Sequence, residues 1–138
     1  MNSIKFVIMK YTLGKEERLK SKKLIERLYK ERNSVKAFPL RMIFLQTEHP
    51  SKFPSQVGVS VPKRNFKRAV DRNRIKRLMR ETFRLQKEIV YNNLEKPYVF
   101  MISYVGKEEC SYEELFLKME TLLTLFVNET KKTKNDKI

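Results

Sequence analysis

The sequence has few of the side chains with which enzymes build catalytic or metal sites. Among its 138 residues are one cysteine, Cys110, and one histidine, His49. One residue of each type cannot form an internal disulfide, a zinc site or a Cys–His dyad. The three glycines, Gly14, Gly58 and Gly106, form no glycine-rich phosphate loop. We therefore predict no catalytic residue in this chain, and the sequence leaves any metal site on it unknown.

Long apolar segments are also absent. No apolar run reaches the roughly 18 residues that suggest a membrane helix, and the apolar stretch at 4–9 is too short for a signal peptide. An unpaired cysteine is typical of a reducing compartment. We therefore expect a cytoplasmic protein without membrane contact. The length predicts a single domain over 1–138, with an ordered core at about 15–129 and flexible basic termini.

Acidic residues are scarce. Asp and Glu number 16 against 31 Lys and Arg, and the net charge is +15. Such an excess favours a nucleic acid or an anionic membrane surface as partner. The charge is densest at 63–84, where ten of 22 residues are basic and two are acidic. Residues 88–129 are acidic overall, so we expect the C-terminal part to face away from a polyanion. We interpret its paired carboxylates, such as Glu108 and Glu109, as solubilising surface.

The first half of the chain predicts one helix and two strands. Residues 1–20 show weak patterning and indicate an extended or frayed arm. Apolar residues recur at helical spacing over 21–31. Alternation at 34–46 predicts a strand, kinked or split in two at Pro39, because proline breaks the ladder of hydrogen bonds. A second strand is expected at 56–61.

The second half predicts helix, strand and helix. A basic helix is expected from about 68 to 92, and the nearly continuous apolar run at 98–104 predicts a buried central strand. Ser111 and Glu114 form a capping box for a last helix, and we expect disorder from Thr130. The predicted fold class is an α/β (α+β) two-layer sandwich in the order α-β-β-(β)-α-β-α.

The basic helix has two distinct faces at about 100° per residue. The face expected to dock on a core holds Ile75, Leu78, Met79, Thr82, Phe83, Leu85 and Gln86. The opposite face holds Asn73, Lys76, Arg77, Arg80 and Arg84. Arginine offers bidentate donors to phosphate and stacks on bases, which favours RNA. The structural alternative is a solvated basic face on an ordinary amphipathic helix.

The motif in this helix resembles a known family. The run Arg72-Asn73-Arg74-Ile75-Lys76-Arg77-Leu78-Met79-Arg80-Glu81, preceded by Lys63-Arg64 and Ala69-Val70-Asp71, is similar to the signature of the bacterial ribonuclease P protein component. The element order matches over about 15–127. The resemblance implies that the basic helix crosses between parallel strands in the left-handed sense, whereas a right-handed crossover is the default.

The resemblance also implies a function. Such a protein binds the catalytic RNA subunit of ribonuclease P and, in a cleft between sheet and first helix, the 5′ leader of precursor tRNA. The RNA, with Mg2+, hydrolyses the phosphodiester that frees the mature tRNA 5′ end. The protein would thus be a subunit of an endoribonuclease, and we expect it to need no protein partner.

Site residues follow from the same resemblance. The implied RNA-binding residues are Lys63, Arg64, Lys67, Arg68, Arg72, Asn73, Arg74, Lys76, Arg77 and Arg80. The implied leader cleft holds Ile25, Tyr29 and Ile43. Many relatives have aromatic residues at the positions of Ile25 and Ile43, so the sequence departs from the family there. From the residues alone, Tyr29 is either a base-stacking platform or part of the core.

Two other functions share some of these sequence features. A non-enzymatic RNA-binding or ribosome-associated protein shares the charge, size and fold class, and only the motif at 72–81 favours ribonuclease P. A helix-turn-helix DNA regulator needs two adjacent helices joined by a tight turn. The basic helix is instead flanked by predicted strands, which disfavours that reading.

Overall fold

The computed structural model describes residues 13–136, so the predicted flexible termini fall largely outside the described residues. The elements in chain order are η1 (Lys15–Glu17), α2 (Lys22–Glu31), β1 (Asn33–Ala37), β2 (Leu40–Gln46), β3 (Ser55–Ser60), α3 (Ala69–Gln86), α4 (Glu88–Tyr91), β4 (Tyr98–Tyr104) and α5 (Tyr112–Asp136). This order agrees with the predicted one, including the first strand split in two, except that η1 is added and the helix predicted at 68–92 is divided into α3 and α4.

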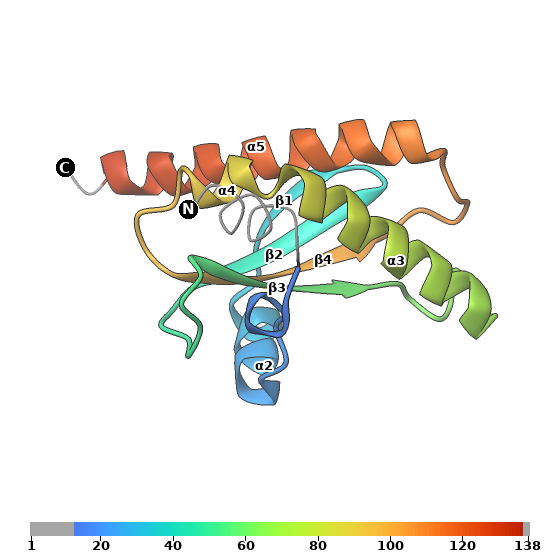
Figure 1. The fold of residues 1–138 in the computed structure, drawn as a ribbon, viewed down its shortest axis with the longest axis horizontal. Coiled ribbons are helices and arrows are strands. Elements are labelled where there is room, and N and C mark those ends of the chain that lie inside the picture. Colours follow the sequence, from blue (N-terminus) through green and yellow to red (C-terminus); the bar gives the residue numbers. More distant parts are fainter. Residues whose placement is uncertain (1–12, 137–138) are drawn as a thin grey trace, which may run out of the picture.

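The four strands form one sheet in the order β1-β2-β4-β3 (Figure 1). β4 pairs antiparallel with β2 and parallel with β3. Its residues Val99, Phe100 and Ile102 are fully buried, which confirms the predicted central strand. A parallel pair needs a long crossover, and α3 and α4 supply it. The left-handed sense of that crossover stays a prediction.

Helices cover the two faces of the sheet unequally (Figure 1). α3, α4 and α5 pack on one face, around a core that includes Phe100 and Ile102. α2 packs on the other face, where Val99 and Met101 contact a smaller cluster with its Leu28. Side chains alternate between these cores because successive residues of a strand point to opposite faces. The predicted α+β sandwich is confirmed.

Pro39 stands between β1 and β2 in a turn, as its missing N–H predicts, and the Phe38–Pro39 peptide is cis. The Pro39 carbonyl accepts a 2.7 Å hydrogen bond from Val105. A Cβ on Gly106 would come within 2.9 Å of the Pro39 ring. A residue without a side chain is therefore required where the chain leaves β4.

The N-terminal residues follow one of the two predicted alternatives, extended or frayed. Arg18 is extended and bridges to β3, and the Leu19 N–H donates to the Val57 carbonyl at 2.9 Å. The predicted C-terminal end needs correction. The chain does not leave the helix at Thr130, since α5 continues through Asp136. Both segments lack a local apolar pattern. The first is fixed by tertiary contacts, and the second adds one hydrogen bond per residue to an existing helix.

Candidate nucleic-acid interface

The two predicted faces of α3 are separated in the structure. Ile75, Met79 and Phe83 are at most 2% exposed and pack into the larger core. Asn73, Arg77 and Arg80 are exposed. The prediction for the buried face is confirmed except at Leu85, which is 37% exposed. The packed side fixes the helix, so the cations on the other side stand on a rigid support.

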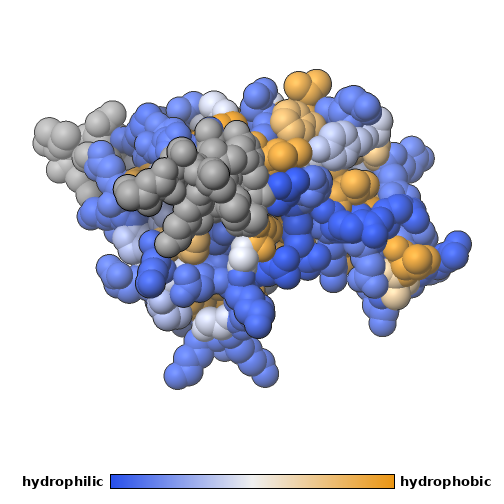
Figure 2. Space-filling model, in the orientation of Figure 1, coloured by the Kyte–Doolittle hydropathy of each residue, from blue (hydrophilic) through white to orange (hydrophobic). Residues whose placement is uncertain are grey.

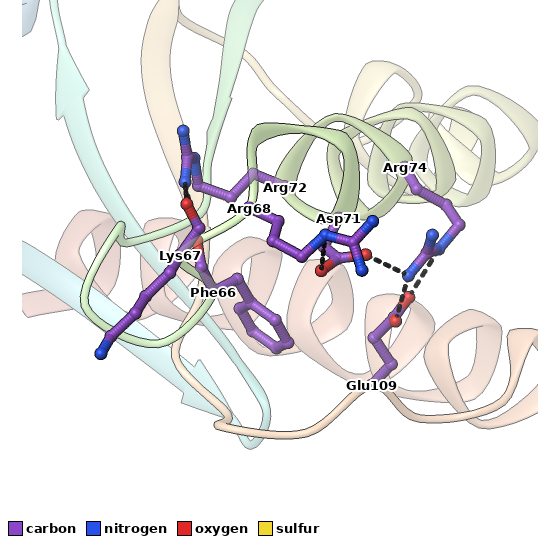
Figure 3. Close-up of polar contacts among 7 residues, drawn as sticks. All are labelled: Phe66, Lys67, Arg68, Asp71, Arg72, Arg74 and Glu109. Atoms are coloured by element: carbon purple, nitrogen blue, oxygen red, sulfur yellow. Dashed lines mark hydrogen bonds and ion pairs between the residues drawn. The ribbon is translucent and has the colours of Figure 1, made fainter.

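At the start of α3, the Arg72 side chain is hydrogen-bonded to the protein's own backbone. Its Nη1 donates to the carbonyls of Phe66 and Lys67, at 2.8 and 2.9 Å (Figure 3). These bonds tie the preceding loop to the first turn of the helix, where no side chain of Arg68 caps the free N–H groups. Arg72 therefore has a structural role in the free protein.

Arg74 is held between two carboxylates (Figure 3). Its Nε donates to Glu109 Oε1 at 3.0 Å and its Nη2 to Asp71 Oδ1 at 3.0 Å. Bonding to Glu109, and then to Asp71, raises the pKa of Arg74. Arg68 lies 4.0 Å from the same Asp71. Glu109 thus lies at the basic helix, which corrects its interpretation as solubilising surface facing away from it.

The cations in the middle of α3 differ from those in its first two turns in their protein contacts. Within the described residues, Lys76, Arg77 and Arg80 have no hydrogen-bond or ion-pair partner among the protein side chains. The loop before the helix adds three exposed cations of the same kind, Lys63, Arg64 and Lys67. Unpaired cations in a row are the electrostatic requirement for binding a phosphate backbone. We interpret these six residues as the free part of the predicted RNA-binding set.

A pocket of about 330 Å³ opens beside this face. Its lining comes from the N-terminal residues 13–20 and from α2, β3, α3 and β4. The lining residues are Leu13, Arg18, Leu19, Lys20, Ile25, Val57, Gly58, Val59, Arg80, Phe83 and Met101. The visible surface between α2 and α3 is mainly hydrophilic (Figure 2). The pocket therefore combines an apolar floor with a cationic rim.

Arg18 and Arg80 approach each other at this rim. Partial burial, followed by the positive charge of Arg18, lowers the pKa of Arg80 from its ordinary value. Two like charges held together, with no carboxylate between them in the described part of the chain, favour an anion at the same place. Arg18 and Lys20 were not among the predicted site residues, because residues 1–20 show only weak local patterning.

The three predicted leader contacts are not brought into one cleft. Ile25 lines the pocket. Tyr29 is 46% exposed on α2, and the pocket lining does not include it. Ile43 is only 6% exposed, because β2 turns it inward to pack beneath α2 with Leu28. Ile43 is therefore a core residue in the free protein, which corrects its placement in an open cleft.

One buried ion pair lies outside every sequence prediction. Glu17 and Lys87 are each 1% exposed and lie 2.6 Å apart. The sequence does contain an indication that Lys87 is buried, because Lys87 follows the buried Phe83 by one helical turn. A lysine at an apolar helical position needs a carboxylate, but the sequence does not say which one.

Comparison with known proteins identifies the family. The family model described as Ribonuclease P matches residues 13–126. The chain belongs to the ribonuclease P protein family. A ribonuclease P protein component from Porphyromonas gingivalis is 37% identical over 91 residues, which span 65% of this chain and 66% of that protein. One from Vibrio cholerae is 32% identical over 108 residues, spanning 77% of this chain and 84% of that protein.

Solved structures of ribonuclease P proteins share the fold. The protein from Staphylococcus aureus has a TM-score of 0.64 at 22% identity, covering 79% of this chain and 94% of that one. The protein from Thermotoga maritima has a TM-score of 0.63 at 23% identity, covering 78% and 96%. The family resemblance seen in the motif at 72–81 is therefore confirmed, while the individual RNA contacts stay predictions.

Among the described residues, no group of three or more His, Cys, Asp or Glu side chains is arranged to hold a metal ion. No helix in the same part of the chain is long and apolar enough to cross a membrane.

Proposed function

We propose that this chain is the protein subunit of ribonuclease P, which assists the endonucleolytic removal of the 5′ leader from precursor tRNA. The observation that carries the proposal is the row Lys76, Arg77 and Arg80 on α3, which have no ion-pair partner among the described residues, in a chain whose residues 13–126 match the family model. Its partners are then the catalytic RNA subunit and the precursor tRNA. The product is tRNA with a mature 5′ end.

The middle of α3 is suited to hold the catalytic RNA. Lys76, Arg77 and Arg80 project from a helix whose opposite side is fixed by Met79 and Phe83. Binding therefore orders few side chains beyond the cations themselves, which limits its entropic cost. Each phosphate that a cation neutralises releases counterions, so the affinity should fall steeply with salt.

The pocket beside α3 is suited to single-stranded RNA, and we assign the 5′ leader to it. Arg18, Lys20 and Arg80 supply positive charge for the backbone, and Ile25 supplies an apolar wall for a base. Tyr29 stands outside on α2 and is placed to contact a leader only beyond the pocket. The assignment to Ile43 is not carried forward.

The chemistry is assigned to the RNA subunit. Among the described residues, no group of three or more His, Cys, Asp or Glu side chains is arranged to hold a catalytic Mg2+. We propose instead that Mg2+ is held mainly by the RNA. The protein's side chains bind and position, and they neutralise the backbone charge that opposes docking of substrate and catalytic RNA.

Reconstitution tests this function. A 5′-labelled precursor tRNA is incubated at low Mg2+ with a bacterial catalytic RNA, with this protein, and with both. We expect cleavage at the mature 5′ end only in the complete mixture. Cleavage by the protein alone would reveal a protein active site. Tight RNA binding without stimulated cleavage would instead favour the non-enzymatic, ribosome-associated alternative.

A further inference from the structure

Glu17 is fully satisfied inside the protein. Its Oε2 accepts from Lys87 Nζ and from the Tyr91 hydroxyl, each at 2.6 Å, and its Oε1 accepts from the Gly14 N–H at 3.1 Å. The Lys87 ammonium also lies 5.3 Å from the centroid of the Tyr91 ring and 6.0 Å from that of Phe53. These contacts surround the carboxylate and the ammonium group, and both residues are shielded from water.

A buried ion pair of this kind contributes little net stability. Removing two charges from water costs as much as, or more than, their attraction returns, and apolar residues of similar volume often serve equally well. The pair instead contributes a fixed geometry, because hydrogen bonds from three donors to one carboxylate are directional and apolar packing is not. Glu17 can therefore fix the position of the segment that carries it.

Glu17 holds the segment 14–19, which we name the N-terminal strap. The strap lies along β3, where Leu19 donates to the Val57 carbonyl at 2.9 Å and Gln56 Nε2 donates to the Glu16 carbonyl at 3.0 Å. Arg18, the residue after Glu17, then lines the cationic pocket opposite Arg80. The repulsion between these two arginines opposes that placement, so the strap needs a fixed anchor.

We propose that the Glu17–Lys87 pair is a positioning device: it locks the N-terminal strap onto β3 so that Arg18 and Arg80 form a preorganised seat for a phosphate of single-stranded RNA. Glu17 and Lys87 are positioning residues, since neither side chain reaches the pocket surface. The identity of the ligand rests on the proposed function, but the locking of the strap does not.

The matched pair of variants Glu17→Gln and Glu16→Gln tests this proposal. Both remove one negative charge from neighbouring residues, and only Glu17 is buried. Binding of a fluorescent single-stranded RNA of about eight nucleotides is measured against salt. We expect Glu16→Gln to bind as the wild type or slightly more tightly. Glu17→Gln should bind roughly fivefold or more weakly, with a log–log salt slope shallower by about 0.7, the value for one lost phosphate contact.

Two further measurements separate positioning from general destabilisation. The Leu19 amide should exchange with solvent at least about tenfold faster in Glu17→Gln, while amides of β4 keep their protection. Combining Glu17→Gln with Arg18→Ala should weaken RNA binding no more than Arg18→Ala alone, because both changes remove the same contact. Fully additive losses would overturn the proposal.

A second variant, Glu17→Leu with Lys87→Met, covers the case in which Glu17→Gln does not fold. It buries no charge, so we expect thermal unfolding close to that of the wild type. The strap still loses its directional bonds, so Leu19 exchange should accelerate and RNA affinity should fall as in Arg18→Ala. Wild-type affinity in this folded variant would contradict the proposal. Global unfolding of both variants would also contradict it, because the pair would then support the whole fold.

Failure of the proposed function would look different. The exchange and oligonucleotide measurements use the protein alone and do not depend on cleavage. A protein that shows the expected strap behaviour but never stimulates precursor tRNA cleavage would keep the positioning device and lose the ribonuclease P assignment. The reverse result would keep the assignment and remove the device.

Discussion

The first two turns and the middle of α3 contain the same types of residue and use them in opposite ways. In the first two turns, Arg72 is bonded to backbone carbonyls and Arg74 to the carboxylates of Asp71 and Glu109. In the middle, Arg77 and Arg80 project without such partners in the described part of the chain. Charge density alone therefore overestimates the size of an RNA-binding surface. Some basic residues of the motif stabilise the start of the helix, and only the others are available to bind RNA.

The difference follows from where the helix meets other elements. The first two turns border the loop at 62–68 and the loop that carries Glu109, so their cations find acceptors inside the protein. Farther along α3, Arg80 lines the cationic pocket, where Arg18 adds a second positive charge. The cations without a protein partner among the described residues therefore lie in the middle of the helix.

The largest expected effect on RNA binding separates binding from stability in the middle of the helix. Arg77→Ala with Arg80→Ala should weaken catalytic RNA binding by at least about tenfold at low salt, since contacts to phosphate are charge-assisted. The salt slope should become shallower by about one for each lost cation. Filter binding across a salt series measures both, and thermal unfolding should change little.

The control for this prediction is Lys36→Ala with Lys96→Ala, which removes the same charge from exposed positions outside α3 and the loops that contact its start. An equal loss of affinity in the control would mean that net charge, and not the face of α3, determines binding.

A truncation on the buried side of the same turns should have the converse effect. Met79 is fully buried, so Met79→Ala should lower the free energy of unfolding by about 2–5 kcal/mol. Leu85→Ala is the comparison, because Leu85 is 37% exposed and should cost much less. Urea denaturation measures both. Similar losses at the two positions would contradict the assignment of the buried face.

Tyr91, the last residue of α4, should make the folded protein less stable at alkaline pH. Burial, together with the bond to Glu17, raises the Tyr91 pKa above its ordinary value of 10.0. The folded state therefore binds this proton more tightly, so the stabilisation is complete below pH 10 and declines above it. One such tyrosine contributes about 1.4 kcal/mol per pH unit. Tyr91→Phe should make the fall between pH 10 and 11 shallower by that amount, and an unchanged slope would contradict it.

In the first turn of α3, the loss of the Arg72 side chain should change the free energy of unfolding by a similar amount. Arg72→Ala should destabilise the protein by about 1 kcal/mol, because it removes two bonds to the loop carbonyls. Its effect on RNA affinity should be smaller than that of Arg77→Ala. A stable Arg72→Ala variant with a large loss of RNA binding would remove the distinction between the two regions of α3.

The smallest effect concerns the acidic partner of Arg74. Glu109→Gln releases one side of the guanidinium, so RNA binding at low salt should become roughly two- to fivefold tighter. Glu108→Gln removes the same charge from the same loop but has no bond to Arg74, and it should have a smaller effect. Equal changes in both variants would reduce the role of Glu109 to net charge.

The sequence predicted what depends on local periodicity. Helical spacing placed Ile75, Met79 and Phe83 on the buried side of α3, and the apolar run at 98–104 identified the central strand. Proline chemistry placed the break between β1 and β2. These features are readable because each residue's environment is set by neighbours one or two turns away.

The remaining features depend on distant pairs. Glu109 and Arg74 are 35 residues apart in sequence, and Glu17 and Lys87 are 70 apart. Nothing local distinguishes Glu109 from the adjacent Glu108, or Glu17 from Glu16. The strap was missed for the same reason, since its order comes from contacts with β3 and α3 rather than from its own pattern.

The strand order has a consequence for how the protein is made. β2 and β3 do not touch each other, because β4 lies between them. Synthesis proceeds from the N-terminus, so a nascent chain that ends before residue 98 has both flanking strands but not the strand that joins them. Each then presents unpaired backbone groups along one edge, an arrangement prone to wrong pairing. The emergence of 98–104 is therefore the step that closes the sheet.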